Sequence, residues 1–299
     1  MKLVFKTPAK INLGLFILGK RPDGYHDLET LFQMVSLYDT VELESREGGI
    51  ELVCDDPRVP TDESNLMIRA ARLLQEAVPE KPGLGCRMVL KKKIPMGAGL
   101  GGGSGNAAGV LMGLNRLWDL RLKSAELSEI AARLGSDIPF FLCAPSALGQ
   151  GRGERLTPLP SPEKFHVILI YPKTPMATAE VYKALNFDLT KNSKNIKILR
   201  EFFSQSNIIS LGAHLHNDLE PVVIERLPVV ESIKGKLRSL SAAGTLVSGS
   251  GSTVFGIFED SKTAEQAFAQ CREEAWDVFL TETVSSFSEF MPEELLNYP

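Results

Sequence analysis

Hydrophobic and polar residues alternate along residues 10–18, KINLGLFIL, with the period of two that is typical of a β-strand. We expect one face to carry Ile11, Leu13, Leu15 and Ile17 and the opposite, polar face to carry Lys10, Asn12 and Gly14. Residues 41–45, 50–54 and 86–94 have a similar character and predict further strands.

Elsewhere the apolar spacing changes to that of a helix. The apolar positions of residues 65–78 fall on one helical face: Leu66, Ala70, Leu73, Leu74 and Ala77. Another helix is predicted after Ser104, which we expect to be its N-cap. A third is predicted from Ser124 to Gly135, because glycine commonly ends helices.

The second half of the chain follows a proline-rich stretch. Residues 156–165, LTPLPSPEKF, predict a linker. The elements expected after it are strands at 166–171, 244–248, 253–258 and 278–284 and a helix at 262–274. Strands and helices mix without regular alternation, which favours two α+β layers over a doubly wound sheet. We expect two domains, residues 1–160 and 161–299.

Composition narrows the possible partners. The net charge of -4, from 33 basic and 37 acidic residues, gives no electrostatic reason to expect a nucleic acid or an anionic membrane, so a small molecule is the expected ligand. The four cysteines include no CxxC pair and predict neither a zinc cluster nor a disulfide framework. Because no apolar run approaches the ~20 residues of a membrane span, we expect a cytoplasmic protein. We predict neither an oligomeric state nor metal ligands.

The glycine-rich stretch at residues 94–109, IPMGAGLGGGSGNAAG, lies between a predicted strand and a predicted helix. In this arrangement backbone N–H groups and the positive end of the helix dipole can bind an anion, and glycine lets the backbone approach phosphate oxygens closely. A tight turn or close packing is the structural alternative.

This stretch and its surroundings differ from other known phosphate-binding motifs. No lysine precedes a serine or threonine at the helix start, so the Walker pattern is absent. Gly97, Gly99 and Gly102 match GxGxxG, but the expected second strand with an acidic end is missing, since Asp119 follows the helix and precedes another. The HRD and DFG elements of protein kinases are also absent.

A different family matches along most of the chain. PMGAGLGGGSGNAA, residues 95–108, resembles the second signature of the GHMP kinases, the superfamily of galactokinase, homoserine kinase, mevalonate kinase and phosphomevalonate kinase. Other blocks agree in the family's order: PAKINLGL at 8–15, RPDGYHDLETLFQ at 21–33, GSDIPFFL at 135–142, ALGQGRGERLTPL at 147–159 and SGSGSTVFGIF at 248–258.

The resemblance implies a two-domain α+β fold. The N-terminal domain would be ribosomal-protein-like, the C-terminal domain ferredoxin-like, and the active site would lie in the cleft between them. It also implies ATP and Mg²⁺ as cofactors. DGYH and LETLFQ are specific to the branch that phosphorylates a cytidyl diphosphate ester of methylerythritol on the non-mevalonate route to isoprenoids, which is therefore the expected activity.

Asp137 and Lys10 are the catalytic residues that the resemblance implies. On spacing alone Asp137 is better explained as the N-cap of a short helix, and Lys10 as a solvated strand lysine. In the family the matching aspartate is the base for the substrate hydroxyl, and the matching lysine stabilises the charge beside it. Asn12, two residues along the strand, would reach the same site.

ATP-binding residues are also implied by resemblance. Asn65 and Lys93 would border the adenine, although Asn65 could equally cap its helix and Lys93 could be a solvated member of the run Lys91 to Lys93. The phosphates would be held by Pro95, Met96, Gly97, Ala98, Gly99, Leu100, Gly101, Gly102, Gly103, Ser104 and Gly105. Gly105 replaces the family's usual second serine, which leaves Ser104 as the hydroxyl for phosphate or magnesium, and Ser136 replaces the more usual alanine.

The implied acceptor site comes from both halves of the chain. Tyr25 and Tyr182 would stack on the two faces of the cytosine, and His26 would hydrogen-bond its edge. The structural alternatives are core cover for Tyr25 and helix packing for Tyr182. Thr178 would be a nearby polar contact, or the helix N-cap. Gly249, Ser250 and Gly251 would lie beside the substrate phosphates, or form only a hairpin turn.

Two other functions compete with this expectation. Another GHMP kinase, of the homoserine or mevalonate type, is disfavoured by DGYH and by the aromatic pair. A non-catalytic nucleotide-binding regulator of the same fold is disfavoured by the presence of both Lys10 and Asp137.

Overall fold

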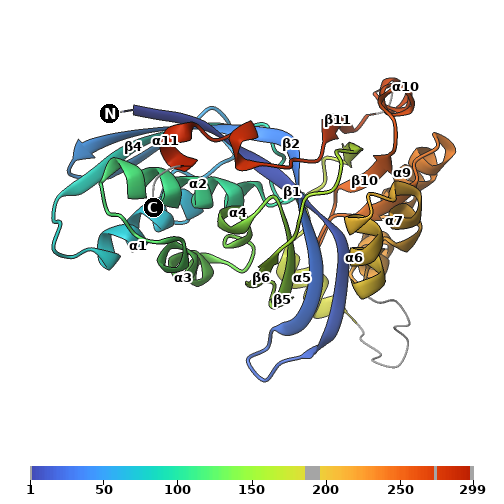
Figure 1. Ribbon diagram of the computed structural model, residues 1–299, viewed down its shortest axis with the longest axis horizontal. Helices are drawn as coiled ribbons and strands as arrows, with labels where there is room; N and C mark the ends of the chain where they lie inside the picture. Colours follow the sequence, from blue (N-terminus) through green and yellow to red (C-terminus); the bar gives the residue numbers. More distant parts are fainter. Residues whose placement is uncertain (1, 186–195, 273–274, 297–299) are drawn as a thin grey trace.

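The protein consists of two β-sheets with helices packed on them (Figure 1). The computed structural model describes residues 2–185, 196–272 and 275–296. The strands are β1 (Lys2–Lys20), β2 (His26–Glu47), β3 (Ile50–Cys54), β4 (Leu84–Lys91), β5 (Ser146–Gly151), β6 (Arg155–Pro158), β7 (His166–Tyr171), β8 (His216–Asn217), β9 (Gly244–Val247), β10 (Val254–Phe258) and β11 (Asp277–Glu282). The helices are α1 (Leu66–Ala77), α2 (Gly102–Leu117), α3 (Ser124–Leu134), α4 (Phe140–Cys143), α5 (Thr178–Ala184), α6 (Ile196–Ser204), α7 (Ile208–His214), α8 (Glu220–Arg226), α9 (Val229–Ser239), α10 (Ser261–Cys271) and α11 (Glu293–Leu296), with a 3₁₀ turn at Phe287–Glu289.

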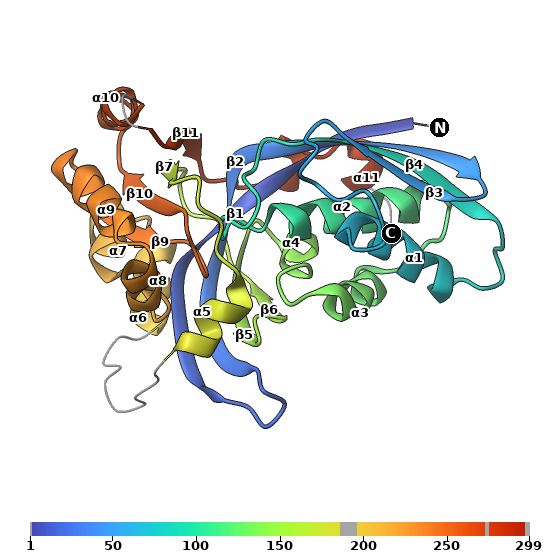
Figure 2. The same cartoon turned by 180° about the vertical axis from the view of Figure 1, so that it is seen from behind.

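The sheets divide the chain's strands between them. The first has the order β3-β4-β2-β1-β8, and β5 pairs with β2 and carries β6. The second is antiparallel, with the order β11-β7-β10-β9. Helices α1, α2 and α4 lie against the first sheet, α3 packs on these three helices, and α6 to α10 lie with the second sheet (Figures 1 and 2). The mixed α+β architecture expected from the sequence is confirmed. No helix in the described ranges is both long and apolar enough to span a membrane.

Strands β1 and β2 form a long antiparallel ribbon, paired from Lys2 and Glu44 at one end to Lys20 and His26 at the other. Its far end projects beyond both sheets as an arm that ends in the turn at residues 21–25 (Figures 1 and 2). The base of this ribbon therefore belongs to the first sheet, and its arm lies beside the second half of the chain.

A β-bulge makes the expected single apolar face of β1 wrong. The register shifts between Asn12 and Gly14, and one extra residue reverses the side-chain alternation that follows it. Ile11 packs in a core shared by the two sheets, whereas Leu15 packs in the core of the second half. Leu15 consequently lines the same cavity as Lys10.

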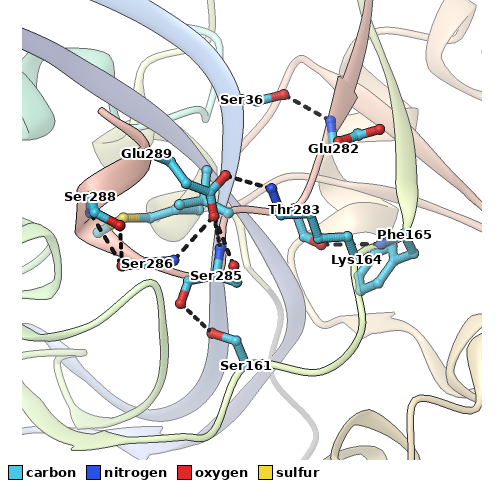
Figure 3. A network of polar contacts seen from close by, with 12 residues as sticks. Ser36, Ser161, Lys164, Phe165, Glu282, Thr283, Ser285, Ser286, Ser288 and Glu289 are labelled. Atoms are coloured by element: carbon cyan, nitrogen blue, oxygen red, sulfur yellow. Dashed lines mark hydrogen bonds and ion pairs between the residues drawn. The ribbon is translucent and has the colours of Figure 1, made fainter. Parts of the chain in front are cut away.

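After β11 the chain returns to the first sheet, as the red segment of Figure 1 shows. Phe290, Met291 and Leu295 are buried in the core of that sheet, and the Lys6 N–H donates to the Phe290 carbonyl at 3.1 Å. Figure 3 shows how this segment is fixed: the Glu289 carboxylate accepts the Ser285 N–H at 2.8 Å and pairs with Lys164 at 2.7 Å.

Two further local expectations are corrected. The proposed linker begins inside β6, which pairs with β5 and extends to Pro158, so only the residues after it connect the sheets. Ser104 is not an N-cap: α2 begins at Gly102, and its N-cap is Gly101 in the left-handed conformation, with φ of 69°. Glycine adopts that conformation without steric cost, so the sequence GGG extends the helix backward by a turn.

Gly235, an exposed residue in the middle of α9, offers a test of helix stability. A Cβ at this position would have nothing within 4 Å. We expect Gly235→Ala to raise the free energy of unfolding by about 0.5 to 1 kcal/mol, because alanine loses less backbone entropy on folding. Urea unfolding followed by circular dichroism would measure the change, and a loss of stability would contradict it.

Candidate active site

Both halves of the chain line one cavity of about 430 Å³ at the start of α2. Its wall includes residues from β1, β2, α5, the glycine stretch and the loop between β9 and β10. The structure brings together these residues singled out in the sequence: Lys10, Asn12, Asn65, residues 95–104, Asp137, Thr178, Tyr182, Gly249 and Ser250.

The glycine stretch is held by its carbonyl groups. The carbonyls of Gly97 and Ala98 accept the N–H groups of Met176 and Thr253, at 3.0 and 3.2 Å. The next two carbonyls are also satisfied: the Gly99 carbonyl accepts the Ser248 hydroxyl at 3.0 Å, and that of Leu100 accepts the Lys10 N–H at 2.9 Å. The loop is thus fixed from both halves of the chain.

Unlike these carbonyl groups, the backbone N–H groups in the middle of the glycine stretch have no protein partner among the described residues. Within the described ranges, no backbone N–H from residue 99 to residue 104 donates a hydrogen bond to the protein. Positive φ angles at Gly97, Gly99 and Gly101 curve the segment, and the N-terminus of the 16-residue helix α2 follows. Unpaired N–H groups at a helix N-terminus form a site for an anion such as a phosphate chain.

Lys10 and Asp137 lie opposite each other in the cavity, with 3.4 Å between Lys10 Nζ and Asp137 Oδ2. Lys10 is 3% exposed and also donates to Asn12 Oδ1 at 2.6 Å, so it is not a solvated strand lysine. Asp137 does not cap the short helix, because α4 begins after Pro139 and has no side-chain cap. Its side chain is 38% exposed, which leaves the carboxylate accessible to a ligand.

Thr30 on β2 completes this polar group and was not singled out in the sequence. Asn12 Nδ2 donates to the Thr30 hydroxyl at 2.8 Å, and that hydroxyl donates to the Gly14 carbonyl at 2.7 Å. Thr30 lies in the block LETLFQ, which was assigned to substrate type without individual roles. The pairing of β1 with β2 decides which of its residues face the cavity.

The basic run at the end of β4 divides between two environments. The side chain of Lys92 is 7% exposed, lines the main cavity and pairs with the fully buried Asp39 at 2.5 Å. The other Asp39 oxygen accepts the N–H groups of Lys93 and Ile94 at 2.7 and 2.8 Å. Lys93 itself is exposed and lines not the main cavity but a neighbouring one, which Lys92 also borders. Lys92 is therefore the lysine of this run that faces the glycine stretch.

Asn65 combines the two interpretations considered for it. Its side chain accepts the Met67 N–H at 2.8 Å and caps α1, while the residue also lines the main cavity.

At the arm side of the cavity, aromatic and basic groups meet. The rings of His26 and Tyr182 lie 5.3 Å apart between centroids, and Arg152 stacks on Tyr25 with 4.9 Å from Cζ to the ring centroid. Burial and the nearby charge of Lys20 lower the pKa of His26, so its imidazole is neutral near pH 7 and offers one donor and one acceptor. Burial raises the pKa of Tyr182, which keeps its phenol protonated.

Some residues singled out in the sequence lie outside the cavity wall. Tyr25 is 55% exposed, so it does not cover the core, and His26 reaches the wall through its contact with Tyr182. Gly105 packs inside α2, where a Cβ would lie 3.0 Å from the Pro8 carbonyl oxygen. A Cβ at Gly251 would face Val223.

The loop between β9 and β10 is both a hairpin connection and part of the cavity wall. The hydroxyls of Ser250 and Thr178 lie 2.8 Å apart. A Cβ at Gly249 would lie 3.2 Å from both Lys10 Nζ and Asn12 Oδ1. Thr178 is the first residue of α5, whose N-cap is Ala177, so the cap alternative for Thr178 is wrong.

Known protein families give the class of this protein. The family model for the GHMP kinases N terminal domain matches residues 65–144, and the model for the GHMP kinases C terminal domain matches residues 199–277. The fold is accordingly that of a GHMP kinase, a class of small-molecule phosphotransferases that use ATP.

Curated relatives narrow the class further. The chain is 39% identical to the 4-diphosphocytidyl-2-C-methyl-D-erythritol kinase of Acetivibrio thermocellus, over 93% of this chain and 98% of that protein. It is 42% identical to the protein of the same name from Acaryochloris marina, over 94% of this chain and 95% of that protein. The chain belongs to the family of 4-diphosphocytidyl-2-C-methyl-D-erythritol kinases.

Solved structures agree with this membership. A crystal structure of 4-(cytidine 5'-diphospho)-2C-methyl-D-erythritol kinase superposes with a TM-score of 0.77 at 33% identity, covering 96% of this chain and 100% of that one. Homoserine kinase from Cytophaga hutchinsonii superposes with a TM-score of 0.76 at 17% identity, covering 95% of each chain, and shares the fold.

Proposed function

We propose that the protein transfers the γ-phosphate of ATP to the 2-hydroxyl of 4-diphosphocytidyl-2-C-methyl-D-erythritol, a step toward isoprenoid precursors. One observation carries the proposal: unpaired N–H groups of the glycine stretch, the Lys10–Asp137 pair and the Tyr182–His26 contact all border one cavity or its wall. This reaction needs a site that binds a phosphate chain, a base paired with a cation, and an aromatic surface for the base of the acceptor.

The proposed mechanism assigns the proton to Asp137. Its carboxylate takes the proton from the 2-hydroxyl as that oxygen bonds to the γ-phosphorus, while the bond from phosphorus to the bridging oxygen of ADP breaks. Lys10, 3.4 Å from the carboxylate, stabilises the negative charge that develops on the transferred group. Asn12 and Thr30 hold Lys10 in place through their hydrogen-bond chain.

The proposed ATP site runs along the glycine stretch. Residues 95–104 bind the phosphates, and Asn65 lies near the base. Lys93 was expected to border the adenine; we give that place to Lys92, because Lys92 lines this cavity.

Magnesium is proposed as the metal that accompanies ATP. Mg²⁺ keeps several waters and takes only one or two protein oxygens beside phosphate. The Ser104 hydroxyl, on the cavity wall, fits that donor set, with the phosphates and water as the other ligands. When bound, the ion would neutralise charge on the phosphates.

The proposed acceptor site places cytosine at the arm side of the cavity, with Tyr25 and Tyr182 as stacking partners, His26 on the base edge, and Thr178, Ser250 and the glycines at 249 and 251 near the diphosphate. Neutral His26 can both donate and accept, which suits the edge of a base.

Tyr182→Ala tests the acceptor site. We expect the KM for the cytidyl acceptor to rise ~10-fold or more, because one stacking face worth about 1 to 3 kcal/mol is lost, while the KM for ATP stays nearly unchanged. Steady-state kinetics with each substrate varied in turn would measure both constants. A rise confined to ATP would place Tyr182 in the other subsite.

An acceptor panel tests the function itself. With ATP and the purified full chain, turnover should appear with the cytidyl diphosphate acceptor and be far weaker with mevalonate, homoserine and galactose. Equal or greater turnover with mevalonate or homoserine would favour another GHMP kinase, and ATP binding without turnover of any acceptor would favour a regulator.

Two broader proposals accompany this function. Because ATP is the donor, we place the reaction in the cytoplasm. We also propose residues 1–160 and 161–299 as the two domains, with the returning segment after β11 packed across the first.

A further inference from the structure

The short strand β8 lies where the arm, the second sheet and the active-site loop meet. Its two residues pair in parallel with β1, His216 with Gly14 and Asn217 with Leu15. Just beyond it, the Asp218 N–H donates to the Leu15 carbonyl at 3.0 Å, and the Asp218 carboxylate accepts the Ile17 N–H at 2.6 Å. This segment is therefore fixed to the base of the arm.

The side chain of Asn217 points the other way, into the loop between β9 and β10. It is 3% exposed, and its Nδ2 donates to the carbonyls of Val247 and Gly249 at 2.9 and 2.7 Å. Its Oδ1 accepts the Leu219 N–H at 2.9 Å. Both amide hydrogens are thus used on one loop, and no other residue type of this size supplies two such donors and an acceptor.

That loop touches each part of the proposed active site. Ser248 donates to the Gly99 carbonyl of the glycine stretch, and Ser250 contacts Thr178. Gly249, whose carbonyl Asn217 holds, lies against Lys10 and Asn12. A shift of the loop would therefore move groups on the donor side and the acceptor side together.

We infer that Asn217 is a positioning residue. It holds the loop at residues 248–251 against Lys10 and fixes the position of that loop relative to the base of the arm. It does not line the cavity and so acts through the loop. This inference rests on the proposed function for its kinetic consequence. Its structural consequence, that the loop's place depends on the two Asn217 donors, is independent of the substrate.

Asn217→Asp is the test, because it keeps the size and replaces the two donors with an oxygen that faces carbonyls. We expect kcat with the cytidyl acceptor to fall about 10- to 100-fold, since a misplacement of ~1 Å in an active site can cost about 100-fold. Amide hydrogen exchange at residues 247–251 should speed up. Asn217→Ser, which cannot span both carbonyls and adds no charge, should change both readouts in the same direction and replaces the first variant if that one does not fold.

Asn115→Asp is the matched control. Asn115 is 2% exposed, and its amide joins the N–H and the carbonyl of Leu122, each at 3.0 Å, away from the cavity wall. This variant should lose stability, yet keep kcat per folded molecule and the exchange rates at 247–251.

The outcomes separate the two proposals. If folded Asn217 variants keep the wild-type kcat and exchange rates at 247–251, the inference is wrong. If exchange speeds up only in the Asn217 variants but wild-type protein does not turn over the cytidyl acceptor, the positioning of the loop stands and the proposed function fails.

Discussion

Asp137→Asn is expected to lower kcat by about 100-fold or more while the Kd for ATP changes little. The substitution keeps the shape of the side chain but removes the base, and general-base catalysis typically contributes ~10²- to 10⁴-fold. The structure strengthens this expectation, because Asp137 caps no helix and its carboxylate faces Lys10 Nζ at 3.4 Å. Lys10 retains its hydrogen bond to Asn12 in the variant, so the local fold should persist.

Steady-state kinetics with the cytidyl acceptor and calorimetric titration of ATP would measure the two quantities. Asp260→Asn is the matched control, since Asp260 does cap a helix: its side chain accepts the Thr263 N–H at 2.8 Å at the start of α10. Asparagine caps helices about as well as aspartate, so this variant should keep full activity. If Asp137→Asn keeps more than about a tenth of the wild-type kcat, Asp137 is not the base.

Local sequence patterns were sufficient to predict the elements that flank the glycine stretch. The alternation before it and the helical spacing after it are properties of short windows, and β4 and α2 appear there. The face of β1 could not be predicted in the same way. The bulge after Asn12 arises from pairing with β2, and a single extra residue exchanges the two faces.

The same distinction, between local patterns and contacts of distant segments, applies to the cavity residues. Lys10, Asn12 and Asp137 could be found because each lies in a block with the family's order of residues. Lys92 and Lys93 are neighbours of the same type, and the difference between them comes from Asp39, which lies 53 positions earlier than Lys92 in the chain. Arg152, on Tyr25, likewise depends on how β5 pairs with β2. Such contacts between distant segments leave no mark in a local pattern.

At Gly99 the glycine stretch lies directly against the loop at residues 248–251, and Gly99→Ala should disrupt both segments. A Cβ at this residue would lie 2.1 Å from the Ser248 carbonyl oxygen and 2.9 Å from that of Gly251, and its φ is +77°. Both obstacles are backbone atoms, so one loop must move. We expect the free energy of unfolding to fall by roughly 2 to 5 kcal/mol, from about 1 to 2 kcal/mol of left-handed strain and about 1 to 3 kcal/mol of overpacking.

The same displacement should reduce kcat/KM for both substrates by ~10-fold or more, because the loop at 248–251 also borders Lys10. Gly83→Ala separates strain from collision. Gly83 has a similar φ of +81°, but a Cβ there would have nothing within 4 Å, and the residue lies in the turn before β4. This control should lose only the strain energy, about 1 to 2 kcal/mol, and keep its kcat/KM. Equal losses of stability and activity in the two variants would mean that the contact between the loops contributes nothing, whereas a larger loss at Gly99 measures what the close approach of the two halves contributes to the active site.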